Sequence, residues 1–358
     1  MAAARIASPG LPADGCRGNR APGGAVILQE IPDIPPRPLT PQNAAFRRWL
    51  YPRWGKEHAL VCARTRFAEL GRVTQPLSIK ACWHGVSEHL VDNRRIRVDD
   101  DAWLVLNEDQ TYSSVFRGDA ATAGGCVNAL CLFVRRGLPG EIAAALAQSP
   151  TQIADQIDVV AQRAPQFAEH LRPHDHTITP LLLDMRAQVE TGSADETWLD
   201  ERCHVLVARL LAAEHVLRAR AAQIRSVKAS TRGELLRRIG WATDYMLSNY
   251  PEPISLDDIA AAARLSKFHL IRLFQQVHGV TPHTFLQNKR ARVARRLIES
   301  SDIDLNEVAV SVGFGSRWTM FRQLRRVYGA SGLELRLGGT PLGACGAPRA
   351  RMALSEHD

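Results

Sequence analysis

Two arginines, Arg272 and Arg322, occupy matching positions in two segments that share one pattern, residues 266–279 and residues 316–329. Each segment starts with a serine, ends with a glycine and has apolar residues at helical spacing. On the exposed face of a helix, a guanidinium can donate two hydrogen bonds to O6 and N7 of guanine, worth about 1–3 kcal/mol of discrimination between bases. A phosphate contact and an ion pair with a neighbouring acid are the alternative interpretations.

The other residues expected to contact DNA lie close to these arginines. The two serines are expected to cap the helices, because a serine hydroxyl accepts a hydrogen bond from a free backbone N–H. Phe268 either touches a thymine methyl group or packs, and Trp318 either faces a groove or folds back onto the protein. The predicted DNA-binding residues are Ser266, Lys267, Phe268, His269, Arg272, Gln275, Ser316, Arg317, Trp318, Thr319, Arg322 and Arg326.

Each of these segments, called the reading helices below, follows a shorter stretch with the apolar spacing of a buried helix. The sequence therefore predicts two helix-turn-helix units, at residues 254–282 and 305–332, joined by a long helix at residues 282–300. The residues expected to point inward from the second reading helix are Met320, Leu324 and Val327. Two reading helices in one chain can enter successive major grooves, about 34 Å apart.

This pattern resembles the DNA-binding domain of the AraC/XylS family of bacterial transcription regulators. The resemblance rests on the runs SLDDIA, ARVARRLI and VAVSVGF and on S-x-x-H-L-x-R-L-F-x-x-x-x-G-x-T-P at residues 266–282, and it covers residues 232–336. The family usually has Ser where Trp318 stands and Pro where Gly332 stands. It also usually has Phe at the positions of Met320 and Leu324. Loss of the proline is expected to weaken the start of the last helix, because proline favours a first helical turn.

The basic charge of the chain is concentrated in the same region. The formal net charge is +8, and residues 232–336 hold 16 Lys and Arg against 10 Asp and Glu, which gives +6. Five of the basic residues lie between Lys289 and Arg296 in the predicted connecting helix. A phosphate-binding surface requires such an excess. A basic, solvated face is the alternative interpretation.

The N-terminal part of the chain has a different texture. Eight of the twenty prolines lie in residues 1–41, which are expected to be disordered. Residues 52–134 hold short segments rich in β-forming residues, typical of a small barrel or sandwich. The run VDNRRIRVDDDAWLVLNEDQTYS is similar to the cupin-like sensor half of many AraC-type regulators. That resemblance implies a small-molecule pocket or dimer contacts in this region.

Helical patterns follow residue 137. The longest, residues 198–225, carries an apolar stripe that either packs on its own domain or pairs with a second copy of the chain. The pair Thr231 and Glu234 has the spacing of a capping box and predicts the first helix of the C-terminal domain, with a boundary near Ala229.

Histidines that could bind a metal ion occur in two places, around His84 and His89 with Glu88, and in the cluster His170, His174 and His176. The first set lacks a third nitrogen ligand, and the second has the polar composition of an ordinary loop, so no metal or cofactor is predicted. The sequence has no G-x-S-x-G motif, P-loop or Rossmann fingerprint. Seven cysteines without a C-x-x-C pair indicate reduced thiols, and no apolar run approaches the ~18 residues of a membrane span.

The predicted fold is α+β. An N-terminal cupin-like β-barrel or sandwich with helices precedes an all-α domain with two helix-turn-helix units joined by a long helix. The predicted boundaries are a disordered lead at 1–41, a sensor or dimerisation domain at 42–228, a DNA-binding domain at 229–338 and a disordered tail at 339–358.

We expect a cytoplasmic, sequence-specific transcription regulator that is not an enzyme and binds double-stranded DNA. The resemblance implies a small-molecule effector at the N-terminal domain that changes the occupancy of the DNA site or the contact with RNA polymerase. Two alternatives stay open: a cupin-type metal-dependent enzyme domain fused to a DNA-binding tail, and a DNA-binding protein without an effector. A homodimer is compatible with the apolar stripe, and no membrane association is expected.

Overall fold

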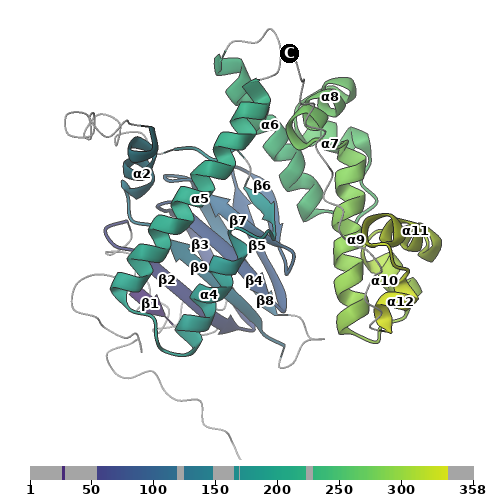
Figure 1. The fold of residues 1–358 in the computed structure, drawn as a ribbon, viewed down its shortest axis with the longest axis horizontal. Helices are drawn as coiled ribbons and strands as arrows, with labels where there is room; N and C mark the ends of the chain where they lie inside the picture. The colour runs from purple at the N-terminus through teal and green to yellow at the C-terminus, as the bar shows by residue number, and fades with distance from the viewer. Residues whose placement is uncertain are drawn as a thin grey trace, which may run out of the picture.

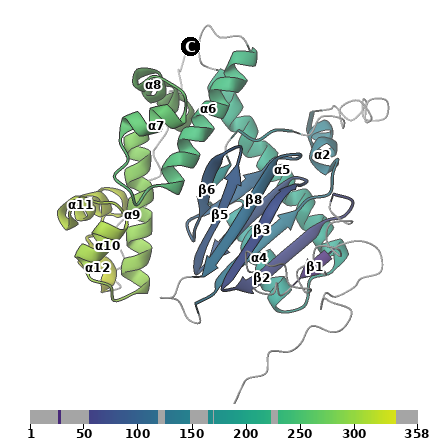
Figure 2. The same cartoon turned by 180° about the vertical axis from the view of Figure 1, so that it is seen from behind.

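The computed structural model describes residues 26–28, 55–118, 125–147, 165–168, 170–222 and 229–337. It has two β-sheets and three helices in the N-terminal part and seven helices in the C-terminal part of the described chain (Figures 1 and 2). This is the predicted α+β architecture. The predicted disordered lead and tail lie outside the described residues, except for one short strand of the lead, β1 (Val26–Leu28).

The N-terminal part is a sandwich of two sheets. The six-stranded sheet has the order β1, β2 (Ala59–Thr65), β9 (Val127–Phe133), β4 (Ser78–Trp83), β7 (Ala102–Leu106) and β10 (Leu171–Pro173). The four-stranded sheet, face on in Figure 2, has the order β3 (Phe67–Thr74), β8 (Thr111–Gly118), β5 (Gly85–Val91) and β6 (Arg94–Val98). Apolar residues of both sheets form one core between them, including Val61, Leu104, Cys131, Ile96 and Phe116.

Helices cover the outer face of the six-stranded sheet (Figure 1). They are α2 (Leu138–Ala147), α4 (Thr179–Glu190) and α5 (Glu196–Ala222). Strand β7 is buried at all five positions because both of its faces are covered, which explains its continuous apolar sequence. The stripe of α5 packs on its own domain through Leu199, Leu206 and Leu210, while Val205 and Val216 are exposed.

The C-terminal helices are α6 (Ala229–Ser248), α7 (Leu256–Ala262), α8 (Lys267–His278), α9 (Pro282–Ser300), α10 (Leu305–Ser311), α11 (Arg317–Tyr328) and α12 (Gly332–Arg336). They enclose a separate apolar core. Glycines end both reading helices, since Gly279 and Gly329 adopt the left-handed backbone with φ of 76° and 72°. Among the helices that the structure describes, none is both long and apolar enough to cross a membrane.

Three local expectations differ from the structure. Helix α6 begins at Ala229, so Thr231 lies inside it, and the Glu234 carboxylate accepts hydrogen bonds from arginines of the next turn instead of forming a capping box. Val327 is 37% exposed, because α11 packs through its middle residues. Helix α12 starts without proline but has a capping box, in which Ser331 and Glu334 exchange hydrogen bonds. This cap offsets the expected weakness.

A buried ion cluster joins the two parts of the molecule. The Lys289 ammonium of α9 lies 3.1 Å from Asp99 Oδ1 and 3.5 Å from Asp101 Oδ2, in the turn between β6 and β7. Arg296, two turns further along α9, lies 3.1 Å from Asp101 Oδ1. Burial alone would raise the pKa of Asp99, but the Lys289 ammonium and the Asp101 backbone N–H hold it below its ordinary value.

A second polar contact docks α6 on the sandwich. The buried Asp244 carboxylate accepts hydrogen bonds from His170 Nδ1 at 2.9 Å and from the Leu171 backbone N–H at 2.8 Å. Arg94 of β6 lies 3.5 Å from the same carboxylate. Together the two contacts fix α6 and α9 against the N-terminal part.

We expect replacement of Lys289 by methionine to loosen this docking. The change leaves Asp99 and Asp101 buried without their cation, and breaking a buried pair in this way costs about 3–5 kcal/mol. Chemical unfolding followed by circular dichroism measures the loss. The matched control is Arg295→Met on the same helix, whose pair with Glu299 is partly exposed. The control substitution should lower the free energy of unfolding by about 1 kcal/mol or less. Equal losses of unfolding free energy in the two variants would contradict a special role for the buried cluster.

Two buried histidines of the sandwich are held in the neutral form. His58 Nδ1 accepts a hydrogen bond from the Arg135 backbone N–H, and burial lowers the pKa of His58 to about 4. The His89 ring lies between the hydroxyls of Ser87 and Ser114. Burial, followed by the charge of Lys80, lowers the pKa of His89 well below its ordinary value.

Stability should therefore fall with acidification in the range set by these histidines. Below the unfolded-state pKa of about 6.5, protons bind the unfolded chain but not the buried rings. The contribution of His58 is present above pH 6.5 and is lost as the pH falls toward about 4, by roughly 2–3 kcal/mol. Melting temperatures measured between pH 7.5 and 5 test this. His58→Asn should flatten the dependence, and an unchanged slope would contradict the assignment.

Candidate DNA-binding surface

The first helix-turn-helix unit is built from α7 and α8. Ser255 caps α7 in a capping box with Asp258, and Ser266 Oγ accepts a hydrogen bond from the His269 backbone N–H at the start of α8. The turn between the helices contains Arg264, whose φ is 52°. The buried side chains that hold α8 on the core are Leu270, Leu273, Phe274 and Val277. This packing leaves the opposite face of α8 toward solvent.

That face carries the predicted residues of the first unit. Lys267, Phe268, Arg272 and Gln275 are exposed, with Phe268 87% exposed. The Lys267 ammonium lies 2.7 Å from Asp257, so part of its charge is balanced by α7. His269 is half-buried. Partial burial lowers the pKa of its ring, and the positive charges of Arg272 and Arg238 lower it further, so the neutral form of the ring is favoured.

The second unit, α10 and α11, repeats this arrangement. Ser316 Oγ accepts a hydrogen bond from the Thr319 backbone N–H, and the Thr319 hydroxyl turns toward the same serine at 3.1 Å. Met320 and Leu324 are buried. The exposed predicted residues of this unit are Ser316, Arg317, Trp318, Arg322 and Arg326. Arg326 also donates a long hydrogen bond of 3.4 Å to Asn288 of α9.

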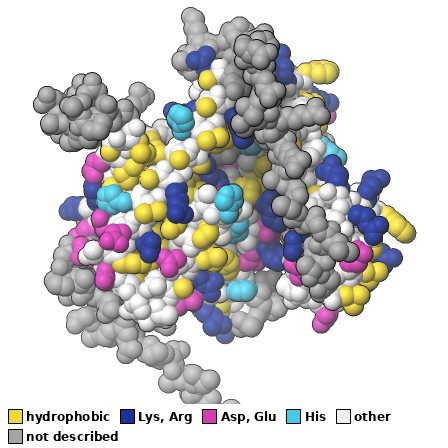
Figure 3. All heavy atoms as spheres, viewed as in Figure 1, with side chains coloured by type: hydrophobic (Ala, Val, Ile, Leu, Met, Phe, Trp, Pro, Cys, Tyr) yellow, Lys and Arg dark blue, Asp and Glu magenta, His cyan; other side chains and the backbone are white. Residues whose placement is uncertain are grey.

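Two large aromatic side chains stand free at equivalent positions. Phe268 and Trp318 are the second residues of α8 and α11, and Trp318 is 79% exposed. The alternative in which Trp318 folds back onto the protein is therefore wrong. In Figure 1, α8 lies near one end of α9 and α11 lies beside the middle of α9. In Figure 3, basic side chains and exposed hydrophobic ones lie close together on this part of the molecule.

The basic run of α9 does not belong to this surface as a whole. Lys289 and Arg296 pair with aspartates of the sandwich, and the buried Arg290 donates hydrogen bonds to the backbone carbonyls of Tyr250 and Glu252. Three of the five basic residues that suggested a phosphate surface thus make internal contacts. Sequence reasoning missed this role. The available signal was the acidic run VDDD at residues 98–101, which can balance the basic run.

Three of the histidines considered as metal ligands, His89, His170 and His174, have other hydrogen-bond partners. Besides Asp244, His170 contacts Gln110, and His174 Nδ1 lies 3.0 Å from the Thr179 hydroxyl. His89 is enclosed by serine hydroxyls in the sandwich. Within the described part of the chain, no group of three or more His, Cys, Asp or Glu side chains is placed to hold a metal ion.

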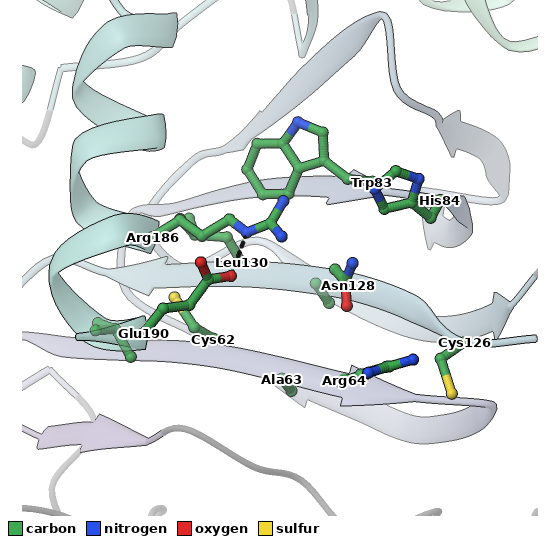
Figure 4. Close-up of a pocket in the computed structure, with 12 residues that line it drawn as sticks. Cys62, Ala63, Arg64, Trp83, His84, Cys126, Asn128, Leu130, Arg186 and Glu190 are labelled. Carbon is green, nitrogen blue, oxygen red and sulfur yellow. Dashed lines mark hydrogen bonds and ion pairs between the residues drawn. The ribbon is translucent and has the colours of Figure 1, made fainter. Parts of the chain in front are cut away.

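The N-terminal part also contains a cavity of about 490 Å³ (Figure 4). Strands β2, β4 and β9 and helix α4 form its walls. The Arg186 guanidinium lies 5.0 Å from the centre of the Trp83 ring and 2.6 Å from the Glu190 carboxylate. The cavity therefore presents the Trp83 ring beside Arg186, whose charge is balanced by Glu190.

Comparison with known proteins agrees with the geometry of the C-terminal helices. A family model described as "Helix-turn-helix domain" matches residues 259–337. The probable transcriptional regulator LumQ of Photobacterium leiognathi is 31% identical over 88 residues, 25% of this chain and 36% of that protein. The transcriptional regulator MtrA of Neisseria gonorrhoeae is 29% identical over 126 residues, 35% of this chain and 42% of that protein.

A longer match is the transcriptional activator RhaS of Escherichia fergusonii, 28% identical over 174 residues, 48% of this chain and 59% of that protein. The matches to these three relatives thus span less than two thirds of each relative's length. A solved AraC-type regulator structure from Chromobacterium violaceum is 27% identical, covering 32% of this chain and all of that one, with a TM-score of 0.28. The C-terminal region of this chain therefore contains a helix-turn-helix domain, and the relatives that match the chain are described as transcription regulators.

Proposed function

We propose that this protein is a sequence-specific DNA-binding transcription regulator whose reading helices, α8 and α11, enter adjacent major grooves. The observation that carries the proposal is the repeated geometry of these helices. Both are capped by serine, end at a left-handed glycine, bury one apolar face and expose an aromatic residue followed by an arginine one turn later. Exposed side chains of this kind make base and phosphate contacts in a major groove.

The twelve residues predicted from the sequence remain the proposed contact set, with graded roles. Arg272 and Arg322 are exposed and are proposed to contact bases. Ser266 and Ser316 cap the helices, so their hydroxyls act mainly on the local backbone. Lys267, with its charge partly balanced by Asp257, is proposed to contact phosphate.

The N-terminal part is proposed to control the DNA-binding part through the docking contacts on α6 and α9. A small effector can do this only if it binds the docked and the released arrangements with different affinity. Within this proposal residues 42–228 form the sensor domain and residues 229–338 the DNA-binding domain, and contact with RNA polymerase and pairing of two copies are further parts of it. No described group of residues favours the metal-dependent enzyme alternative.

Recovery of bound fragments from sheared DNA of the source organism tests the proposal. The purified full chain is mixed with the fragments, and those retained are sequenced. Sites that share two boxes about one helical turn apart, roughly 10 base pairs, are expected from two tandem reading helices. Even recovery across the genome would overturn sequence-specific binding by this chain.

The arginines give a sharper prediction on a recovered site. Arg272→Ala should weaken binding to that site by about 1–3 kcal/mol and reduce the preference for the contacted base pair. Binding to random DNA should change little. Lys267→Ala is the matched control, because loss of a phosphate contact lowers binding to all sequences alike. Titrations of both variants on both DNAs measure the difference, and equal losses on both DNAs for Arg272→Ala would make this arginine a phosphate contact.

A further inference from the structure

A second cavity, of about 770 Å³, lies between the sandwich and helices α5 and α6. Its walls come from both parts of the molecule, with the loops before β6 and β8 on one side and the start of α6 on the other. Cavities of several hundred Å³ are typical of small-molecule sites. The side chains that matter here are Arg94, His170, Arg218, Arg237 and Trp241.

The Trp241 ring connects this cavity to the first helix-turn-helix unit. The guanidinium of Arg94, from β6, lies 4.9 Å from the ring centre, and that of Arg264 lies 5.3 Å from it. Arg264 belongs to the turn between α7 and α8, and its carbonyl accepts a hydrogen bond from Arg238 of α6. A side chain of the sandwich and one of the helix-turn-helix turn therefore contact the same indole ring.

The cavity lining holds four carboxylates and four arginines, and three of the carboxylates are paired with arginines inside the protein. Glu214 is paired with Arg172 at 3.2 Å and with Arg218 at 3.1 Å, and Glu108 is paired with Arg136. Arg94 is less well paired. Its Nη1 is buried without a hydrogen-bond partner, and the carboxylate 3.5 Å away, on Asp244, already accepts from His170. Burial lowers the pKa of Arg94 more than the nearby carboxylates of Asp244 and Asp92 raise it, so the charge of Arg94 is incompletely compensated.

We propose that this cavity binds a small organic anion, a carboxylate or a phosphate, at the Arg94 guanidinium that lies over the Trp241 ring, and that it is the effector site of the protein. The proposal rests on the proposed function as a regulator. Because the walls belong to both parts of the molecule, the anion binds the docked arrangement more tightly than the released one. The cavity of Figure 4 lacks this property, since its walls come only from the N-terminal part.

Thermal unfolding of the full chain tests the site, with inorganic phosphate and acetate as probes and chloride at matched ionic strength as the reference. At about 10 mM of a bound probe, mass action should raise the melting temperature by roughly 2 °C or more. Arg94→Gln should abolish the rise, and Arg94→Lys, which keeps the charge, should retain part of it. Arg64→Gln, in the wall of the other cavity, should retain all of it.

The outcomes separate the two anion classes and the two proposals. A rise with phosphate alone or acetate alone identifies the class of anion. Absence of a rise in melting temperature with both probes overturns the site. An equal rise in wild type and Arg94→Gln also overturns it, because a rise that does not need Arg94 is the general effect of a salt on stability.

The probe that binds is then added to DNA titrations on a recovered site. A change of affinity in wild type but not in Arg94→Gln supports the effector role, and no change in wild type overturns that role. Failure to recover any site counts against the proposed function and leaves the thermal result standing.

Discussion

The two parts of this molecule are held together by charges that neither part can bury alone. Lys289 is 2% exposed, and its carboxylate partner Asp99 comes from a turn 190 positions earlier in the chain. Moving such ions out of water costs several kcal/mol each, and only partners in good geometry repay the cost. A different arrangement of the two parts would leave Lys289, Asp99 and Asp101 desolvated and unpaired, or would require them to return to water. The cluster therefore selects one docking geometry. Since α8 and α11 both pack on α9, that geometry also fixes the reading helices relative to the sandwich.

Much of the C-terminal fold was predictable because it depends on local chemistry. The serine caps and glycine ends of α8 and α11 follow from hydrogen-bonding capacity and backbone freedom at single positions. The buried face of α8 follows from a 3.6-residue period. The same period wrongly predicted that Val327 points inward. The period identifies one side of a helix, but it does not show how far along that side the core extends. Thr231 and Glu234 had the spacing of a cap, but two arginines in the next turn compete for the carboxylate.

The contacts between distant segments could not be predicted in this way. An arginine or lysine on a helix has the same side chain whether it faces a phosphate or a buried aspartate, and the choice depends on which segment the fold brings opposite. The basic run of α9 and the acidic run before β7 are both visible in the sequence, yet their pairing is a property of the docked sandwich. Trp318 posed the same problem, because the indole is large enough either to fill a core or to stand at a surface, and only the packing around α11 shows that it is exposed.

This use of charge changes how the DNA-binding surface is expected to work. The salt dependence of binding follows the number of phosphates neutralised, and that number is set by the cations that reach the backbone of DNA. Lys289, Arg290 and Arg296 make contacts inside the protein, so the formal excess of +6 in residues 232–336 overstates the positive surface. Non-specific attraction is then weaker than composition suggests. In the proposed complex with DNA, a larger share of the binding energy comes from the exposed faces of α8 and α11, where aromatic and arginine side chains lie close together. A surface of this kind favours selectivity for a sequence over general affinity for DNA, which is the balance that the proposed function requires.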